Sequence, residues 1–138
     1  MKKIKAEGRV FRFERPAKIR TDFLEVFPYR GRPQLIEYTT REFSAVCPFS
    51  GLPDIATVKI EYIPAGRCLE LKSLKYYFVS YRNVGIYQEA ATDRIFGDID
   101  RILKPAYLRI STIYNTRGGI DAICFMEKGD RSGYIQKK

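Results

Sequence analysis

Residues 56–83, ATVKIEYIPAGRCLELKSLKYYFVSYRN, contain the change of hydrophobic period that decides the fold. Residues 56–63 alternate between apolar and polar side chains, which predicts a β-strand with one buried face. A Pro-Ala-Gly turn at residues 64–66 ends that strand. The apolar side chains then recur at spacings of three and four, which predicts a helix over residues 69–83. Its apolar face consists of Leu71, Leu74 and Phe78.

The same two patterns continue on both sides of this stretch. Residues 34–46 are rich in β-branched and aromatic side chains and predict a preceding strand. A second helix is expected over residues 87–104 and ends before a proline. Residues 107–115 and 120–127 predict two strands that the turn at 116–119 joins into a hairpin. The apolar face of the second helix consists of Ala91, Ile95, Ile99 and Ile102.

The order strand, strand, helix, helix, strand, strand predicts an α+β domain. The expected architecture is a four-stranded antiparallel sheet with both helices on one face. Such a sheet has exposed edges, and pairing the edges between subunits in a closed ring or barrel covers them. The sequence therefore favours a homo-oligomer.

The length of 138 residues favours one domain. Residues 1–33 are rich in Arg, Lys and Pro and are interpreted as an N-terminal arm with a short strand. Residues 34–128 form the expected catalytic domain. Residues 129–138, with two glycines and a Lys-Lys end, are expected to be a C-terminal tail.

The composition excludes several classes of site. Lys and Arg number 25 against 16 Asp and Glu, and there is no histidine. A Ser-His-Asp triad, a Cys-His dyad and a zinc site with histidine ligands are therefore excluded. Three separated cysteines argue against a disulfide scaffold or a Cys-rich metal site, so no metal is expected. Reduced thiols, no apolar run of membrane-spanning length and no signal peptide predict a cytoplasmic protein without membrane contact.

The net charge of +9 is spread along the chain and forms no long basic run. This distribution favours a basic oligomer or a site for an anionic cofactor over a dedicated nucleic-acid arm. No nucleic-acid partner is needed for the preferred interpretation.

The segment Cys47–Asp54, CPFSGLPD, joins the first two predicted strands and is stiffened by two prolines. A thiol and a carboxyl group on such a loop could converge. The alternative is that Cys47 is a small buried hydrophobic residue and Asp54 a turn former. From this loop alone, the alternative is favoured.

Four motifs together resemble the NADPH-dependent 7-cyano-7-deazaguanine reductases, the QueF family of nitrile reductases in queuosine biosynthesis. They are CPFSGLPD at 47–54, ELKSLKYY at 70–77, YRN with Gln88-Glu89, and TRGG at 116–119. The resemblance runs from about residue 34 to about residue 125 and is to the short, single-module form. It implies the tunnelling fold, in which oligomerisation forms the barrel, and a ring-based homo-oligomer, a decamer of two pentamers.

The resemblance also implies roles for individual residues. Cys47 matches the nucleophile that adds to the nitrile carbon of the deazapurine substrate to give a thioimide, and Asp54 matches the proton donor. NADPH is the implied cofactor, with two molecules used for a four-electron reduction. The residues implied in substrate binding are Leu69, Glu70, Leu71, Gln88 and Glu89. Those implied in cofactor binding are Lys72, Ser73, Lys75, Arg117 and Gly118. Cys68 and Cys124 match no catalytic position and are interpreted as structural.

General chemistry agrees with these assignments. A nitrile resists hydride addition, whereas a thioimide is a C=N group that hydride reduces. Addition of the thiolate places negative charge on nitrogen, which a nearby acid must protonate. A proton passing from Cys47 to Asp54 meets both needs without histidine. The carboxylates of Glu70 and Glu89 suit the N–H and amino donors of a guanine-like edge.

The sequence departs from the family pattern at one position. Many members carry His-Glu where this chain has Gln88-Glu89. Glutamine donates and accepts hydrogen bonds but does not titrate, so it replaces a histidine that positions substrate and not one that transfers protons. The turn also has Thr116 where members often have proline.

Two alternatives remain open at this stage. An amidine-forming enzyme of archaeosine biosynthesis would use the same thioimide without NADPH, and the intact ELKSLKYY motif argues against it. A non-catalytic nucleic-acid-binding module would explain the basic charge and the aromatic content, but it leaves the Cys47–Asp54 loop unexplained.

Overall fold

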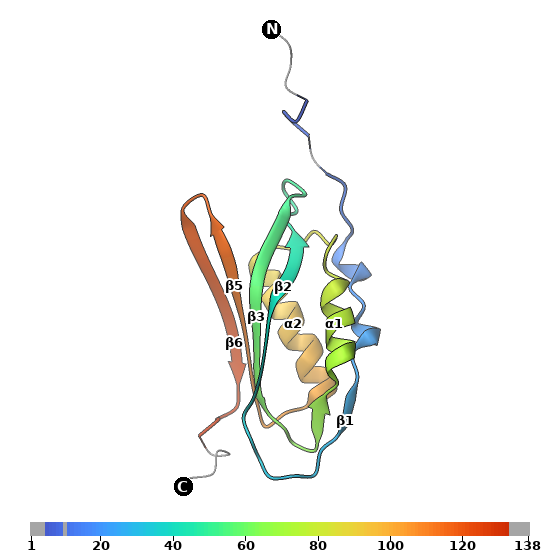
Figure 1. The fold of residues 1–138 in the computed structure, drawn as a ribbon, viewed down its shortest axis with the longest axis vertical. Helices are drawn as coiled ribbons and strands as arrows, with labels where there is room; N and C mark the ends of the chain where they lie inside the picture. Colours follow the sequence, from blue (N-terminus) through green and yellow to red (C-terminus); the bar gives the residue numbers. More distant parts are fainter. Residues whose placement is uncertain (1–4, 10, 133–138) are drawn as a thin grey trace.

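A computed structural model describes residues 5–9 and 11–132, and its centre is an antiparallel sheet in the order β2-β3-β5-β6 (Figure 1). The four expected strands are confirmed, and β3 begins three residues earlier than expected. The sheet strands are β2 (Ile36–Val46), β3 (Pro53–Ile63), β5 (Tyr107–Arg117) and β6 (Ile120–Lys128).

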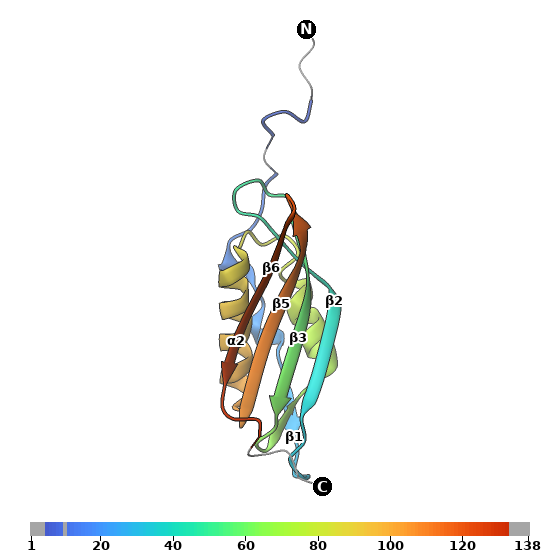
Figure 2. The same ribbon diagram turned by 90° about the vertical axis from the view of Figure 1, so that its left-hand side faces the viewer.

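Two helices, α1 (Leu71–Val79) and α2 (Gln88–Leu103), cover one face of the sheet (Figure 2). The side chains of β3 alternate accordingly, since those facing the helices are buried. This alternation confirms the expected α+β class with both helices on one face. The buried side chains of β3 on this face are Asp54, Ala56, Val58, Ile60 and Tyr62.

Helix α1 is shorter than the expected span of 69–83. The side chain of Glu70 accepts hydrogen bonds from the backbone N–H groups of Lys72 and Ser73, so the helix begins at Leu71. The preceding residues form the short strand β4 (Arg67–Leu69). Leu71 was expected on the buried face but is 49% exposed, because it lies in the first turn beside an open groove.

Helix α2 matches its expected span to within one residue at each end. Lys104 follows it in the left-handed conformation and donates its backbone N–H to Asp100. Leu103 is fully buried, whereas the expected core residue Ile102 is only partly buried. No helix in residues 5–9 and 11–132 has the length and apolar character needed to cross a membrane.

The N-terminal segment packs along α1 and contributes to the core. Ile19 and Leu24 are buried in the main hydrophobic cluster. The expected short strand is β1 (Val26–Pro28), which pairs with β4. Two 3-10 turns precede it, η1 (Pro16–Lys18) and η2 (Thr21–Phe23). Residues 1–4 and 10 of the predicted arm, and residues 133–138 of the predicted tail, lie outside the described residues.

A buried carboxylate fastens this segment to both helices. Asp98 of α2 accepts hydrogen bonds from the Tyr77 hydroxyl at 2.8 Å and from the Thr21 hydroxyl at 3.1 Å. Arg94 also pairs with Asp98, at 2.8 Å. Asp98 therefore links α1, α2 and η2 at one point in the interior.

Candidate active site

Cys47 lies directly after β2 in a tight loop. The backbone N–H of Cys47 donates to the carbonyl of Leu52 at 2.9 Å, and the N–H of Gly51 donates to the carbonyl of Cys47 at 2.7 Å. Gly51 adopts a φ of 71°, a conformation that favours glycine. These bonds hold the half-buried thiol at one end of the sheet.

The surroundings of Cys47 lower the pKa of its thiol. Partial burial acts in the opposite direction, but hydrogen bonding by the backbone N–H groups of Ser50 and Phe49 and by the Ser50 hydroxyl outweighs it. The positive charge of Arg117 lowers the pKa further. A thiol in this setting is more often a thiolate, which is the nucleophilic form.

Asp54 lies in β3, where it pairs with Ala45 of β2. The alternative interpretation of Asp54 as a turn former is therefore wrong, because the strand extends across Pro53 to reach it. Its side chain is on the helix-facing side of the sheet and is 5% exposed. The Arg117 guanidinium lies 3.2 Å from the carboxylate, and the Gln88 amide donates to the same oxygen at 3.5 Å. A buried carboxylate thus has one cation and one amide as partners.

Arg117 reaches Asp54 from the end of β5. Gly118 and Gly119 follow it, and their positive φ values of 57° and 76° form the hairpin turn. The expected hairpin is confirmed, but its turn is shorter than the predicted 116–119, because β5 continues to Arg117. Arg117 was predicted to bind the cofactor, and in this structure its guanidinium pairs with Asp54. Gly118 lies beside it, exposed at the tip of the hairpin.

Gln88 and Glu89 form the first turn of α2 at the same end. The Thr92 hydroxyl donates to the carbonyl of Gln88 at 2.9 Å and shares a hydrogen bond of 2.6 Å with the hydroxyl of Thr112 on β5. These bonds fix the first turn of α2 against the sheet. The negative charges of Asp54 and Glu89 both raise the pKa of the buried Tyr114, after the larger effect of its burial. Both carboxylates therefore lie near Tyr114.

Leu69, Glu70 and Leu71 lie at the opposite end of the sheet. The backbone N–H of Leu69 donates to the Tyr62 hydroxyl at 3.1 Å. Tyr62 follows Asp54 by eight residues along β3, which corresponds to about 26 Å of extended strand. Leu69 is fully buried in the core, and the Glu70 carboxylate caps α1. One protomer therefore does not bring these three residues to Cys47.

Two of the three candidate cofactor residues on α1 fit a phosphate group. Lys72 and Lys75 are exposed, and neither forms a salt bridge with a described residue. Ser73 differs, because its buried hydroxyl accepts from the N–H of Glu25 at 3.0 Å and donates to the carbonyl of Glu70 at 2.8 Å. Ser73 thus holds the start of α1 and has no hydroxyl free for a ligand.

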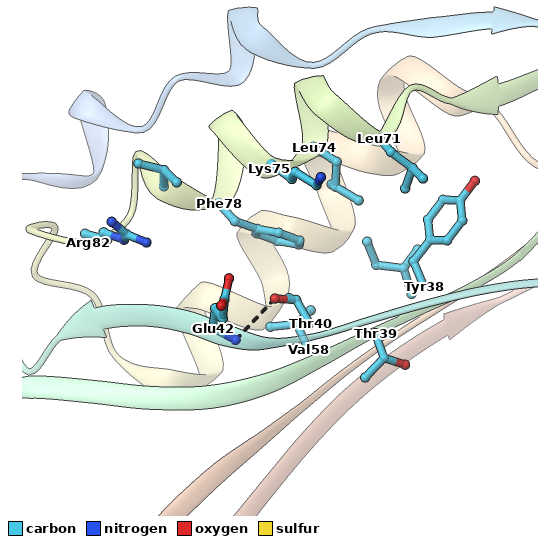
Figure 3. A pocket seen from close by; sticks show the side chains of 12 residues that line it. Tyr38, Thr39, Thr40, Glu42, Val58, Leu71, Leu74, Lys75, Phe78 and Arg82 are labelled. Carbon is cyan, nitrogen blue, oxygen red and sulfur yellow. Dashed lines mark hydrogen bonds between the residues drawn. The ribbon is translucent and has the colours of Figure 1, made fainter.

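A cavity of about 400 Å³ lies between α1 and the edge strand β2 (Figure 3). Its walls are mainly apolar, and Lys75 and Arg82 give it two cationic groups. It contains none of the residues that surround Cys47. Leu71 and Lys75 are the predicted site residues that line it.

The sequence argument did not find Ser50 or Thr92. Ser50 follows Cys47 by three residues within one tight loop, and that spacing brings its backbone N–H and hydroxyl to the sulfur. Thr92 is four residues after Gln88, a spacing that lets a hydroxyl on a helix bond the earlier carbonyl. Spacing alone could therefore have identified both residues as neighbours of the site.

Comparisons with known proteins agree with the motifs. The family described as "QueF-like protein" matches residues 53–133. Two proteins named NADPH-dependent 7-cyano-7-deazaguanine reductase, from Thermotoga petrophila and Thermotoga maritima, are each 56% identical over 135 residues, covering 96% of this chain and 98% of the relative. A protein of the same name from Caldicellulosiruptor bescii is 50% identical over 75% of this chain and 80% of its own.

A solved structure, of the archaeosine synthase QueF-Like in its apo form, has a similar fold. The TM-score is 0.67 at 27% identity, over 72% of this chain and 98% of the solved chain. The family match covers more than half of the chain, and the two Thermotoga relatives align over nearly its whole length. The chain therefore belongs to the QueF family, alongside relatives named as NADPH-dependent 7-cyano-7-deazaguanine reductases.

Proposed function

We propose that this protein reduces the nitrile of 7-cyano-7-deazaguanine to an aminomethyl group with NADPH, a step that supplies queuosine biosynthesis. The observation that carries the proposal is that a thiol of lowered pKa, Cys47, and a buried carboxylate, Asp54, lie at the same end of the sheet and share Arg117 as a neighbouring cation. The 56% identity to relatives named as this reductase supports the substrate and the cofactor.

In the proposed reaction, the Cys47 sulfur attacks the nitrile carbon. A C–S bond forms, one C–N π bond breaks, and its electron pair moves to nitrogen. A proton must reach that nitrogen, which yields a thioimide with a C=N–H group. Two hydrides and one proton then convert the thioimide to CH₂–NH₂, while the C–S bond breaks and its electron pair returns to sulfur as the thiolate.

Asp54 is the residue proposed to hold and deliver the first proton. Its burial shields the carboxyl group from bulk water, and Arg117 and Gln88 fix its orientation. Arg117 lies beside Asp54 and favours the thiolate form of Cys47, which in this proposal passes its proton to the Asp54 carboxylate. A proton released by Cys47 can then be kept locally, so the site works without histidine.

Two NADPH molecules, bound in turn, would each supply one hydride. Lys72 and Lys75 are proposed to hold its phosphate groups, since both ammonium groups are exposed cations. Arg117 also remains a candidate for phosphate binding, because its side chain is 43% exposed although it pairs with Asp54. Gly118 offers backbone without side-chain obstruction beside it.

Gln88 is proposed to position the substrate and Asp54 together. Its amide donates to Asp54 and retains acceptor capacity in its oxygen. Glu89, one residue further along α2, is proposed to accept the ring N–H and amino donors of the deazapurine. Neither role requires a titrating imidazole.

The complete site is proposed to form between protomers of a ring-based homo-oligomer. The edge strands β2 and β6 are available for pairing with another copy. The helix-free face of the sheet also carries exposed Ile55, Ile123 and Phe125, which favours association. Such an assembly would bring Glu70 of one protomer to Cys47 of the next.

An amidine-forming reaction is the second candidate, and the fold shared with the archaeosine synthase is the observation that favours it. Both candidates form the thioimide, but only the reductase consumes NADPH. The identity to that protein is 27%, against 56% to the named reductases, so reduction is preferred.

One assay tests the proposal. The protein is mixed with 7-cyano-7-deazaguanine and NADPH, and the loss of cofactor absorbance is followed with intact-protein mass spectrometry. Oxidation of two NADPH per nitrile is the expected result. A covalent adduct on Cys47 without oxidation would identify the amidine-forming alternative. Absence of both adduct and oxidation would contradict the proposal.

A further inference from the structure

We propose that residues 11–14, here called the N-terminal brace, position two parts of the site for catalysis. These parts are the loop of residues 47–52, here called the Cys47 loop, and the first turn of α2. The catalytic part of this inference rests on the proposed function. Phe11, Phe13 and Glu14 of the brace supply the contacts, and none of them belongs to the motifs that identify the family.

Glu14 is fixed by two backbone hydrogen bonds to the connection between α1 and α2. Its N–H donates to the carbonyl of Asn83 at 2.7 Å, and its carbonyl accepts from the N–H of Gly85 at 2.8 Å. In Figure 1 this connection crosses between the arrowhead of β2 and the blue N-terminal segment. The brace thus adds an outer strand-like segment to the connection.

The same connection is bonded on its other side to the end of β2. The N–H of Val46 donates to the carbonyl of Val84 at 3.0 Å, and the N–H of Ile86 donates to the carbonyl of Val46 at 3.1 Å. Val46 directly precedes Cys47, and Ile86 lies two residues before Gln88. The α1–α2 connection therefore links the brace to the end of β2, which precedes Cys47, and to the start of α2, which carries Gln88.

Two glycines allow the brace to approach this closely. A Cβ atom on Gly51, in the Cys47 loop, would lie 2.4 Å from the carbonyl oxygen of Phe11. A Cβ atom on Gly85 would lie 2.2 Å from the ring of Phe13. Both distances are far below van der Waals contact, so any side chain there must displace the brace or its neighbour.

The shape of the Cys47 loop decides how its backbone N–H groups meet the sulfur. Hydrogen bonding by Ser50 and Phe49 to the sulfur depends on a loop that Gly51 closes against Phe11. A shift of the reacting atoms by about 1 Å can lower an enzymatic rate roughly a hundredfold. Loss of the brace is therefore expected to slow attack by Cys47 while the core remains folded.

The test compares Gly85→Ala with Gly97→Ala. Neither glycine has a positive φ, but a Cβ on Gly97 in α2 would meet no atom within 4 Å. Thioimide formation is measured by mass spectrometry with 7-cyano-7-deazaguanine and without NADPH. Cys47 alkylation by iodoacetamide is measured without substrate. Gly85→Ala is expected to slow thioimide formation by about tenfold or more, and Gly97→Ala to leave both rates unchanged.

Phe13→Ala removes the ring without creating a clash, so it tests the brace even if Gly85→Ala fails to fold. The double variant is expected to match Phe13→Ala, because the added methyl group then meets no ring. Wild-type alkylation and thioimide rates in Phe13→Ala would overturn the inference. Additive effects in the double variant would also overturn it.

The two rates separate this inference from the proposed function. If the wild-type protein alkylates at Cys47 but forms no thioimide, the proposed function fails. The alkylation rates of the variants then still decide whether the brace positions the loop.

Discussion

The two ends of the sheet are built in different ways. At the Cys47 end, four distant parts of the chain converge: the brace, the β2–β3 loop, the start of α2 and the end of β5. At the Glu70 end, the polar groups around the start of α1 bond to one another and to the backbone of Glu25 in the N-terminal segment. The Cys47 end thus brings together, within one chain, most of the residues proposed for the chemistry. The Glu70 end lies too far away to join these residues within one protomer, so its proposed part in the site requires a second protomer.

The largest expected effect comes from removing Cys47, the proposed nucleophile. Cys47→Ala should abolish both the covalent adduct and NADPH oxidation, measured by intact-protein mass and cofactor absorbance. Cys124→Ala on β6 is the matched control and should retain both. Turnover remaining in Cys47→Ala would show that the Cys47 end is not the reactive one.

Replacing Asp54, the proposed proton donor, tests whether the Cys47 end still binds substrate when it no longer reduces it. Asp54→Asn keeps the shape of the side chain and its contact with Gln88, but it removes the charge that pairs with Arg117. Binding of the deazapurine, measured by calorimetry, should persist while NADPH oxidation stops. Asp100→Asn, at a surface pair with Lys128, should behave like the wild type. Normal oxidation by Asp54→Asn would exclude Asp54 as the donor.

Mixing two inactive variants tests whether the ends meet between protomers. Cys47→Ala and Glu70→Gln are denatured together and refolded as mixed oligomers. If each site takes Cys47 from one chain and Glu70 from another, random assembly restores about a quarter of the sites. NADPH oxidation by the mixture, with each variant refolded alone as control, measures this. No recovery would argue that Glu70 is not part of a shared site.

A smaller effect is expected from Arg117→Gln. The positive charge of Arg117 lowers the pKa of Cys47, so its removal raises that pKa and leaves less thiolate at neutral pH. At pH 7 the alkylation rate of Cys47 should fall by about tenfold for each unit by which its pKa rises. The rate should recover at higher pH. Arg109→Gln, which lies eight residues earlier on β5 and pairs with Glu61, is the control. An unchanged pH dependence of the alkylation rate would contradict an effect of Arg117 on the pKa of Cys47 and leave cofactor binding as its proposed role.

The smallest effect concerns stability at the Glu70 end. Backbone hydrogen bonds from Ser73 and Lys72 lower the pKa of Glu70 in the folded protein. Its capping therefore stabilises the fold above the ordinary carboxyl range near pH 4 and is lost as the pH falls through the lowered pKa. Glu70→Ala should lower the Tm at pH 7, and the difference should vanish in acid. Glu7→Ala, outside α1, is the control and should leave the Tm at pH 7 unchanged. An equal loss from Glu70→Ala at every pH would contradict the capping role.

The sequence predicts the sheet and the helices well because both depend on periodic burial, which is a local signal. The apolar pattern predicts that α1 starts at residue 69. The helix begins at Leu71 instead, because the side chain of Glu70 caps it there. It misplaces Asp54 because a strand that starts on a proline resembles a turn. The pairing of Arg117 with Asp54 joins residues 63 positions apart, and no pattern in the chain indicates it. Motifs nominate Cys47 as the nucleophile and Asp54 as the acid, whereas their surroundings depend on the fold.

The N-terminal segment is fixed unevenly along its length, and this affects how the protein loses activity on heating. Ile19, Leu24 and the Thr21 contact with Asp98 anchor it in the core, whereas residues 11–14 are held mainly by the two backbone bonds of Glu14. Local opening starts where few buried contacts oppose it, so the chain should fray from this end before the sheet melts. Because the frayed part lies on the Cys47 loop, thermal inactivation should precede global unfolding.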